Sequence, residues 1–415
     1  MRLARLGAAG AFLLAASAAA GADYELRLDE RRPLQVEMTL RVDPAEARRL
    51  TVEKGREALL LSVPACPSGP LAPAGTGAWM KPIGCAAVTW SARLTDQDAE
   101  GLDAIAPASA WSAKHGLWIL TDALPWLSPE SSPSGTVLAV ARMESGEVSR
   151  SFRLSDAQAP LTVLIGKGAP RRFRSGDMEM RVFGEAPAGA EADDLQQKVA
   201  DTWGAWKRDL VVNEDAAPSA IDIFWTRPPA GAEPGFFASS GSHAILMQHV
   251  PEGDAPEAKL RSAVMLIGAH EGFHALGAGI PGARPAWVNE SWASYFAYQA
   301  AKRHLDAASL AEARDLIEMP APRSLLAAQR AWDAGDQSQA FIFYGKGARF
   351  WGEVEGVLNG PANASGKLAA LIQRSRGMAG MDWSSAEGVA AWLDAHSGGR
   401  ARPIVLCYLE GAGCP

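Results

Sequence analysis

The chain has 415 residues, of which 48% are hydrophobic and 21% are charged, and its 40 Lys and Arg against 47 Asp and Glu give a formal net charge of −7. This length exceeds what one hydrophobic core usually holds, so two or three domains are expected. The mildly acidic balance, without a basic cluster, argues against nucleic acid and anionic membrane surfaces as partners.

Residues 1–22 have the features of a secretory signal peptide. Arg2 and Arg5 supply the positive start, residues 8–16 are apolar, and the small residues 20–22 precede a cleavage site. A short anchor helix that is not cleaved is the alternative. No later segment approaches the ~20 apolar residues that a membrane span needs. We therefore predict a mature chain that is secreted or periplasmic, with no membrane span after signal removal.

The four cysteines fall into two pairs that are close in sequence. Because exported chains meet oxidising conditions, we predict the disulfides Cys66–Cys85 and Cys407–Cys414. Free buried thiols are the alternative. A zinc site made by these cysteines is disfavoured, because the two pairs lie far apart and lack the C-x₂₋₄-C spacing.

Residues 23–175 have the pattern of an all-β domain. Regular short strands with turn signals between them are typical of a β-sandwich. Alternating segments separated by Pro and Gly clusters predict strands over residues 24–28, 34–40, 58–63, 87–94, 117–121 and 136–140.

Beyond residue 176 the pattern becomes mixed. Leu195, Val199 and Trp203 recur at helical spacing and predict a helix over 194–210, and strands are expected over 220–225 and 244–247. From residue 256 to about 396 the pattern is mostly helical. The sequence therefore predicts an α+β protein, with an N-terminal sandwich-like domain (23–175), a mixed domain (176–310) and a helical C-terminal region (311–415).

The run His270-Glu271-Gly272-Phe273-His274 ends a predicted helix that starts near Asp254. Residues four apart share one helix face, so His270 and His274 can aim both imidazoles at one point. Zinc prefers such nitrogen ligands, at about 2.0–2.1 Å. Glu271 is rotated around the helix axis to lie beside the metal, where its carboxylate can take a proton from an activated water. Two histidines spaced by accident are the alternative.

Glu290 offers a third ligand. A second helix is predicted from about Pro285, after a turn over residues 277–282, and Glu290 lies in its first turn. Two antiparallel helices joined in this way can face one another, which would give a His₂Glu set with one position open, the catalytic form of a zinc site. The alternative is a glutamate that merely favours a helix N-terminus. We predict one zinc per chain, held by His270, His274 and Glu290.

These segments resemble the gluzincin metallopeptidases, and among them the aminopeptidase groups, including the glycyl aminopeptidase family. Such proteins have HExxH followed by W-x-x-E-G/S on the next helix, which the segment 287–291 matches. The segment 344–348, Tyr-Gly-Lys-Gly-Ala, resembles the family's Y-x-K-G-A motif. The three motifs occur in the family's order, and the resemblance covers residues 270–351, with a vaguer extension to the N-terminal β region.

The resemblance implies a thermolysin-like catalytic domain with zinc on the paired helices. It implies that His270, His274 and Glu290 are the zinc ligands. It also implies that Glu271 is the general base and that the Tyr344 hydroxyl donates a hydrogen bond to the tetrahedral intermediate.

The sequence departs from the family in three respects. The interval between His274 and Glu290 is shorter than in the main aminopeptidase branch. The G-x-M-E-N strand, which supplies an amine-binding glutamate in that branch, is not recognisable, and its nearest positional counterpart, residues 240–245, has no carboxylate. A C-terminal PDZ module, common in the glycyl aminopeptidase branch, is not expected.

We predict an exported zinc metallopeptidase, aminopeptidase-like, that hydrolyses peptide bonds in a peptide or protein substrate. Two alternatives stay open: a weak or inactive peptidase-like protein that serves in binding or envelope assembly, and a zinc hydrolase of a non-peptide bond. The presence of both Glu271 and Tyr344 argues against the first of these.

Overall fold

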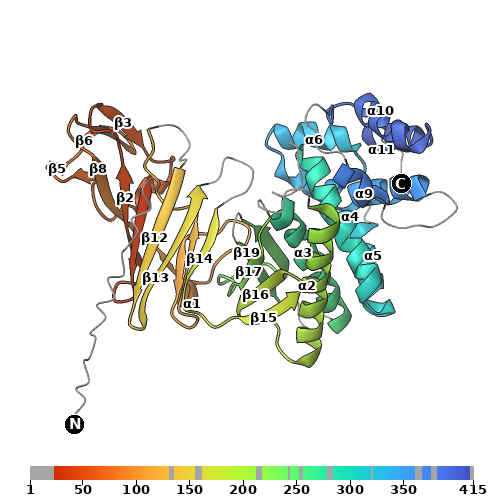
Figure 1. Ribbon diagram of the computed structural model, residues 1–415, viewed down its shortest axis with the longest axis horizontal. Helices are drawn as coiled ribbons and strands as arrows, with labels where there is room; N and C mark the ends of the chain where they lie inside the picture. Colours follow the sequence, from red (N-terminus) through yellow and green to blue (C-terminus); the bar gives the residue numbers. More distant parts are fainter. Residues whose placement is uncertain are drawn as a thin grey trace, which may run out of the picture. The chain divides into compact units, whose positions relative to one another are not determined.

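The computed structural model describes residues 23–129, 135–154, 161–211, 217–241, 244–251, 256–277, 284–318, 321–359, 367–374 and 381–411 (Figure 1). The predicted signal peptide, residues 1–22, lies outside these ranges. The chain divides into two compact units. Unit 1 comprises the described parts of Met1–Arg93 and Pro125–Leu154, and unit 2 those of Leu94–Leu124 and Ser155–Pro415.

Unit 1 contains two β-sheets. In the larger sheet β1 and β12 are parallel and the other neighbouring strands are antiparallel. Val36, Met38 and Leu40 of β2 are buried at alternate positions, as expected for a strand with one face on a core. The larger sheet has the order β13 (Gly146–Leu154), β12 (Gly135–Met143), β1 (Tyr24–Asp29), β2 (Gln35–Arg41), β8 (Ala87–Arg93), β4 (Ala65–Cys66), β5 (Gly69–Pro70), and the smaller sheet the order β3 (Arg48–Thr51), β7 (Ala78–Lys81), β6 (Ala72–Gly75).

The strand predicted over residues 58–63 is wrong. A short 3₁₀ helix, η1 (Arg56–Leu59), occupies its start, and Leu60 forms a single bridge to Ala92. Leu61 and Val63 are 45% and 59% exposed, so this apolar run does not cover a sheet face.

The predicted disulfide Cys66–Cys85 is confirmed, with the two Cα atoms 5.7 Å apart. It joins β4 to the segment before β8 across a sequence separation of 19, and such a cross-link limits the freedom of the unfolded chain. The predicted Cys407–Cys414 pairing involves Cys414, which lies outside the described residues.

Unit 2 is built on a five-stranded mixed sheet. β16, β17 and β19 are parallel, and β15 and β18 pair antiparallel with them at the two edges. The order is β15 (Arg171–Ser175), β16 (Met178–Gly184), β17 (Ala220–Trp225), β19 (Ala244–Val250), β18 (Gly235–Ser240). A separate sheet has the order β14 (Thr162–Gly166), β11 (Leu117–Thr121), β10 (Ala110–Ser112), β9 (Thr95–Asp96), and the helices α1 (Gln97–Glu100), α2 (Ala190–Leu210) and α3 (Glu257–Leu276) complete this part.

Both faces of the five-stranded sheet are buried. Ile221 and Ile223 of β17 belong to the core shared with α2 and α3, which lie beside the sheet in Figure 1. Phe224, between Ile223 and Trp225, belongs instead to a core shared with Leu117 and Ile119 of the four-stranded sheet. Packing therefore groups residues 94–124 with unit 2, although the strand pattern placed them in the N-terminal β region.

Helix α4 (Ala286–His304) takes part in both main cores of unit 2. Trp287 and Trp292, near its start, are buried in the core of the C-terminal helices, whereas Ala297 and Ala301 lie in the core under the sheet. The predicted α+β organisation with a helical C-terminal region is confirmed. The remaining elements are α5 (Ala307–Ile317), α6 (Leu325–Asp333), η3 (Gln337–Gln339), α7 (Ala340–Ile342), η4 (Phe343–Gly347), α8 (Ala348–Asn359), α9 (Lys367–Arg374), α10 (Ala386–Ser397) and α11 (Arg402–Glu410).

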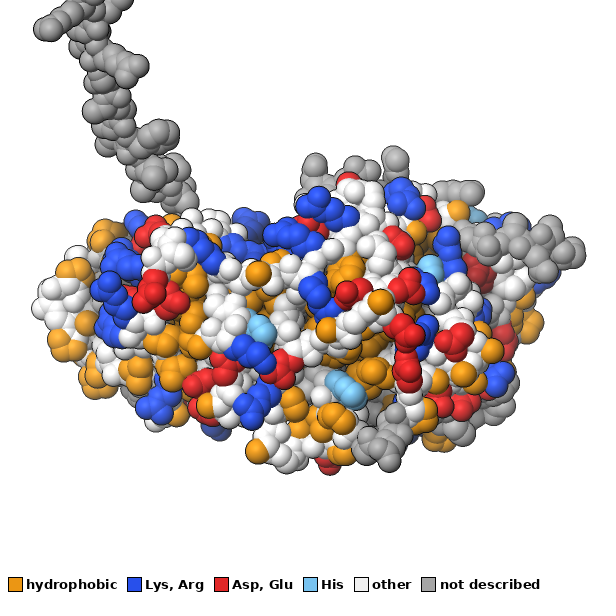
Figure 2. All heavy atoms as spheres, turned by 90° about the horizontal axis from the view of Figure 1, so that it is seen from below, with side chains coloured by type: hydrophobic (Ala, Val, Ile, Leu, Met, Phe, Trp, Pro, Cys, Tyr) orange, Lys and Arg blue, Asp and Glu red, His pale blue; other side chains and the backbone are white. Residues whose placement is uncertain are grey.

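The surface carries charges of both signs. Figure 2 shows basic and acidic side chains interspersed over one face, in keeping with the small net charge of −7. Among the described residues, none of the helices combines the length and the apolar character needed to cross a bilayer.

A close approach between α2 and α3 fixes the helix that carries the HExxH run. Trp203 of α2 donates its indole N–H to the carbonyl of Gly268, at 3.2 Å. One turn on, a Cβ atom added to Gly272 would lie 1.8 Å from the Trp203 Nε1 atom. Only a residue without a side chain therefore fits at Gly272.

We expect Gly272→Ala to destabilise the protein by at least about 1–3 kcal/mol, because the buried indole cannot withdraw from the new methyl group. Gly268→Ala is a matched control in the same helix, since its Cβ would meet Val199 at 3.4 Å, an ordinary contact. That change should be neutral or stabilising by up to about 1 kcal/mol through helix propensity. Urea unfolding followed by circular dichroism measures both changes. Equal stability of the two variants would contradict the packing described.

Candidate active site

The last turns of α3 carry both histidines of the HExxH run. His270 and His274 lie four residues apart, and their rings stand edge to face with centroids 4.7 Å apart. Phe273, between them, is buried against Trp206 and Phe296 and so fixes the orientation of this turn. The helix begins at Glu257 with Pro256 at its N-cap position, and the predicted cap, Asp254, lies outside the described residues.

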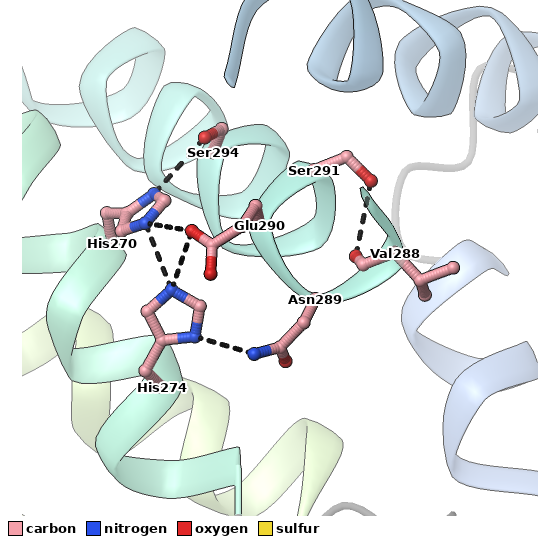
Figure 3. A network of polar contacts seen from close by, with 7 residues as sticks. All are labelled: His270, His274, Val288, Asn289, Glu290, Ser291 and Ser294. Atoms are coloured by element: carbon pink, nitrogen blue, oxygen red, sulfur yellow. Dashed lines mark hydrogen bonds and ion pairs between the residues drawn. The ribbon is translucent and has the colours of Figure 1, made fainter. Parts of the chain in front are cut away.

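Helix α4 brings Glu290 to the same point (Figure 3). The Glu290 Oε2 atom lies 3.2 Å from the Nε2 atoms of both His270 and His274, and these two nitrogens are 3.0 Å apart. Within the described residues, this is the one group of three metal-binding side chains whose ligand atoms converge. The three residues that the sequence predicts as zinc ligands are thus brought together by two neighbouring helices.

The geometry of these three atoms fits a tetrahedral cation. Ligands at about 2.0–2.1 Å from a tetrahedral zinc are about 3.3 Å from one another, close to the separations found here. The other ring nitrogens face outwards: His270 Nδ1 lies 3.1 Å from the Ser294 hydroxyl, and His274 Nδ1 lies 3.2 Å from the Asn289 amide.

These outer contacts determine which ring nitrogens can bind a metal. When each Nδ1–H donates outwards, to the Ser294 oxygen and to the Asn289 amide oxygen, both Nε2 atoms keep a free lone pair. In the structure the Asn289 amide nitrogen faces His274 Nδ1, and a half-turn of the amide group exchanges that nitrogen for the oxygen. Three acceptor atoms then face one point without a donor among them, and a cation at that point would satisfy all three.

The carboxyl group of Glu290 and the imidazole of His274 shift each other's pKa values. Burial opposes ionisation of Glu290, but its contacts with His274 and His270 outweigh this and lower the pKa of the carboxyl group. Burial lowers the pKa of the His274 imidazole, but the Glu290 carboxylate outweighs it, so the net change is upwards. Glu290 is therefore ionised over the physiological range of pH, the state in which a carboxylate can bind a metal.

Glu271 and Tyr344 line one cavity with His270. Glu271 is buried, with 9% of its surface exposed. The Tyr344 ring stands edge-on to the His270 ring, with centroids 5.3 Å apart, and keeps 39% of its surface exposed. Burial, and then the nearby Glu290 and Glu271 carboxylates, raise the pKa of the Tyr344 phenol, which therefore remains a hydrogen-bond donor at working pH.

Tyr344 reaches the cavity through an irregular segment. It lies in η4, a single π-helical turn between α7 and α8, and such turns widen a helix locally and often occur at functional sites. Gly347 of this turn packs directly on α4, because a Cβ there would lie 2.3 Å from the Ser291 Cβ atom. The motif segment 344–348 thus holds η4 against the helix that carries Glu290.

Sequence reasoning missed the two residues that hold the histidines from outside. Asn289 adjoins Glu290, and Ser294 follows it by four residues on the same helix face. That spacing was available in the sequence, but only the distance between α3 and α4 shows that both side chains reach the imidazoles. The edge strand beside the cavity is β18, Gly235–Ser240, and not the segment 240–245 to which sequence position pointed.

Over 94% of its length, the chain is similar in structure to two solved proteins. It matches an aminopeptidase N family protein from Idiomarina loihiensis with a TM-score of 0.66 and 12% identity, over 94% of this chain and 76% of that one. It also matches an M1 zinc metallopeptidase from Deinococcus radiodurans with a TM-score of 0.50 and 14% identity, over 94% of each chain. The chain has the fold of the M1 zinc metallopeptidases.

This finding confirms the fold that the gluzincin resemblance implied. At 12–14% identity the likeness is one of fold. No family model matches the sequence, and no curated protein matches it either.

Proposed function

We propose that the chain is an exported, zinc-dependent metallopeptidase that hydrolyses peptide bonds, with one zinc held by His270, His274 and Glu290. The observation that carries the proposal is the convergence of three ligand atoms at 3.0–3.2 Å beside a cavity that Glu271 and Tyr344 also line. The names of the structural neighbours support the same class of reaction. The signal-like residues 1–22 support export.

A zinc ion in this site would polarise a substrate carbonyl and lower the pKa of a water towards neutrality. Glu271 takes the proton of that water in this proposal, and its position directly after His270 on α3 and in the lining of the same cavity supports that role. Once the water has attacked the carbonyl carbon, Glu271 returns the proton to the leaving nitrogen, and the bond between carbon and nitrogen breaks.

Tyr344 stabilises the charge that develops on the carbonyl oxygen. Its hydroxyl is protonated at working pH and stands on the cavity wall beside His270. A donor that is held in position before the reaction stabilises the transition state without the cost of reorganising water. The cavity walls around Tyr344 and His270 are mainly apolar. Low polarity strengthens the hydrogen bond between the Tyr344 hydroxyl and the negatively charged oxygen.

We expect Glu271→Gln to keep zinc and to lose about 10²–10⁴ of the rate of hydrolysis, because the lost group is a base and not a ligand. The experiment digests a broad peptide library with protein purified without a metal-affinity tag, and measures zinc by elemental analysis. Glu257→Gln is the control, since it makes the same change at an exposed position at the start of α3. Loss of zinc together with activity would give Glu271 another role, and an inactive zinc-loaded wild-type chain would favour the binding-protein or non-peptide alternatives.

We expect Tyr344→Phe to reduce kcat by roughly 10²–10³, because it removes one hydrogen bond made in the transition state. KM should change much less, and zinc content not at all. Tyr298→Phe, on α4 and outside the cavity lining, is the control. Steady-state kinetics on any cleaved peptide decides the matter, and a near wild-type kcat for Tyr344→Phe would remove this residue from the mechanism.

A further inference from the structure

The cavity beside the ligand residues is a small, mostly apolar chamber. Its volume is about 320 Å³, which is at the lower end of the roughly 300–1,000 Å³ of ligand pockets and suits one side chain with its flanking peptide. The apolar walls come from β18, α3, α5 and one loop of unit 2, and they include Ile105, Phe236, Phe237, Leu266, Ile267 and Ile317.

Carboxylates are nearly absent from this lining. Among the described residues that line the cavity, Glu271 is the one acidic side chain, and the proposed reaction uses it as the base. The strand at the cavity, β18, reads Gly-Phe-Phe-Ala-Ser-Ser and has no Asp or Glu at any position. It is also the edge strand of the five-stranded sheet, so one side of its backbone has no neighbour among the strands of the described residues.

Binding of a free α-ammonium group in this cavity would therefore be unfavourable. Its positive charge would lose water against Phe236 and Phe237, and the one carboxylate among the described lining residues, Glu271, is taken up by its role as the base. Burial of an unpaired charge is costly. An acylated nitrogen, as in the interior of a peptide, carries no charge and loses much less. Its N–H and C=O groups can pair with the open side of an edge strand such as β18.

Ile105 makes the apolar wall reach the surface. It is 61% exposed, yet its backbone is fixed: the Ala104 N–H donates to Gln248 Oε1 at 3.2 Å, and the Ser239 hydroxyl donates to the Ala104 carbonyl. The Ile105 N–H donates to the Asp103 carboxylate at 2.8 Å. A ligand that covers this apolar side chain removes it from water, and the burial of apolar surface favours binding.

We propose that this site cleaves internal peptide bonds next to a large apolar residue, so that the chain is an endopeptidase for which a free amino terminus is not required. The inference rests on the proposed peptidase function and names its substrate class. The apolar side chain of the substrate fills the chamber between α3, β18 and Ile105. The substrate backbone runs along β18, which has no Asp or Glu that could select an amino terminus.

The test compares matched peptides with the zinc-loaded full chain. Ten-residue peptides differ at one central position, which is Phe, Leu, Ala or Glu, and each is made with a free and with an acetylated amino terminus. We expect cleavage at one internal bond, a kcat/KM at least about tenfold higher for Phe and Leu than for Ala or Glu, and less than about a threefold effect of acetylation. Mass spectrometry of the products locates the bond.

Two results would separate the inference from the function beneath it. Stepwise release of single residues from the amino terminus, abolished by acetylation, overturns the endopeptidase assignment and leaves the peptidase function standing. Zinc-loaded protein that cleaves no peptide overturns both.

A pair of surface variants tests the role of Ile105. Ile105→Ala should lower the preference for Phe over Ala by about threefold or more, mainly through KM. Ile83→Ala is the matched control, because Ile83 is 71% exposed and lies in unit 1, outside the cavity lining. An unchanged preference in the Ile105 variant would remove Ile105 from the substrate site.

Discussion

The site depends on the short distance between α3 and α4, because ligand atoms on two helices can share one cation only when both backbones are held close and in register. The three atoms lie 3.0–3.2 Å apart. On the two flanks of this helix pair, glycines allow the neighbouring segments to pack closely. Gly272 lets Trp203 of α2 pack onto α3, and Gly347 lets η4 pack onto α4 at Ser291. A single added methyl group at either glycine would meet an atom that is already buried.

Helix α4 is packed into a hydrophobic core at each end and carries the polar site residues between them. Trp287 and Trp292 anchor its start among the C-terminal helices, and alanines anchor its end under the sheet. Between these anchors it presents Asn289, Glu290 and Ser294 to the histidines of α3. The two cores therefore hold α4 rigidly, so that its three polar side chains stay in contact with the histidines. The contacts of Asn289 and Ser294 orient the imidazole rings more than they stabilise the fold.

The sequence was most informative where the residue type and the periodicity of a helix or strand point to the same structure. The spacing of His270 and His274 predicts a shared helix face, and the alternation in β1, β2 and β12 predicts a buried sheet face, because both patterns follow from backbone geometry alone. The strand prediction over residues 58–63 was wrong, because exposed apolar residues there have the same sequence pattern as a buried strand. The roles of Asn289 and Ser294, the edge position of β18 and the grouping of residues 94–124 with unit 2 depend on contacts between distant segments, which no local period encodes. The motif predicted Tyr344 as a site residue, and Tyr344 does line the cavity, whereas no pattern in the sequence predicted the π-helical turn that carries it.

The most direct test of the account is the position of the metal. Crystals grown with zinc and measured on both sides of the zinc absorption edge should show one strong anomalous peak per chain, at about 2.0–2.2 Å from His270 Nε2, His274 Nε2 and a Glu290 carboxylate oxygen. Glu271 should lie beside the ion without coordinating it. A peak at other residues, or no peak between the three ligands in zinc-saturated crystals, would contradict the account.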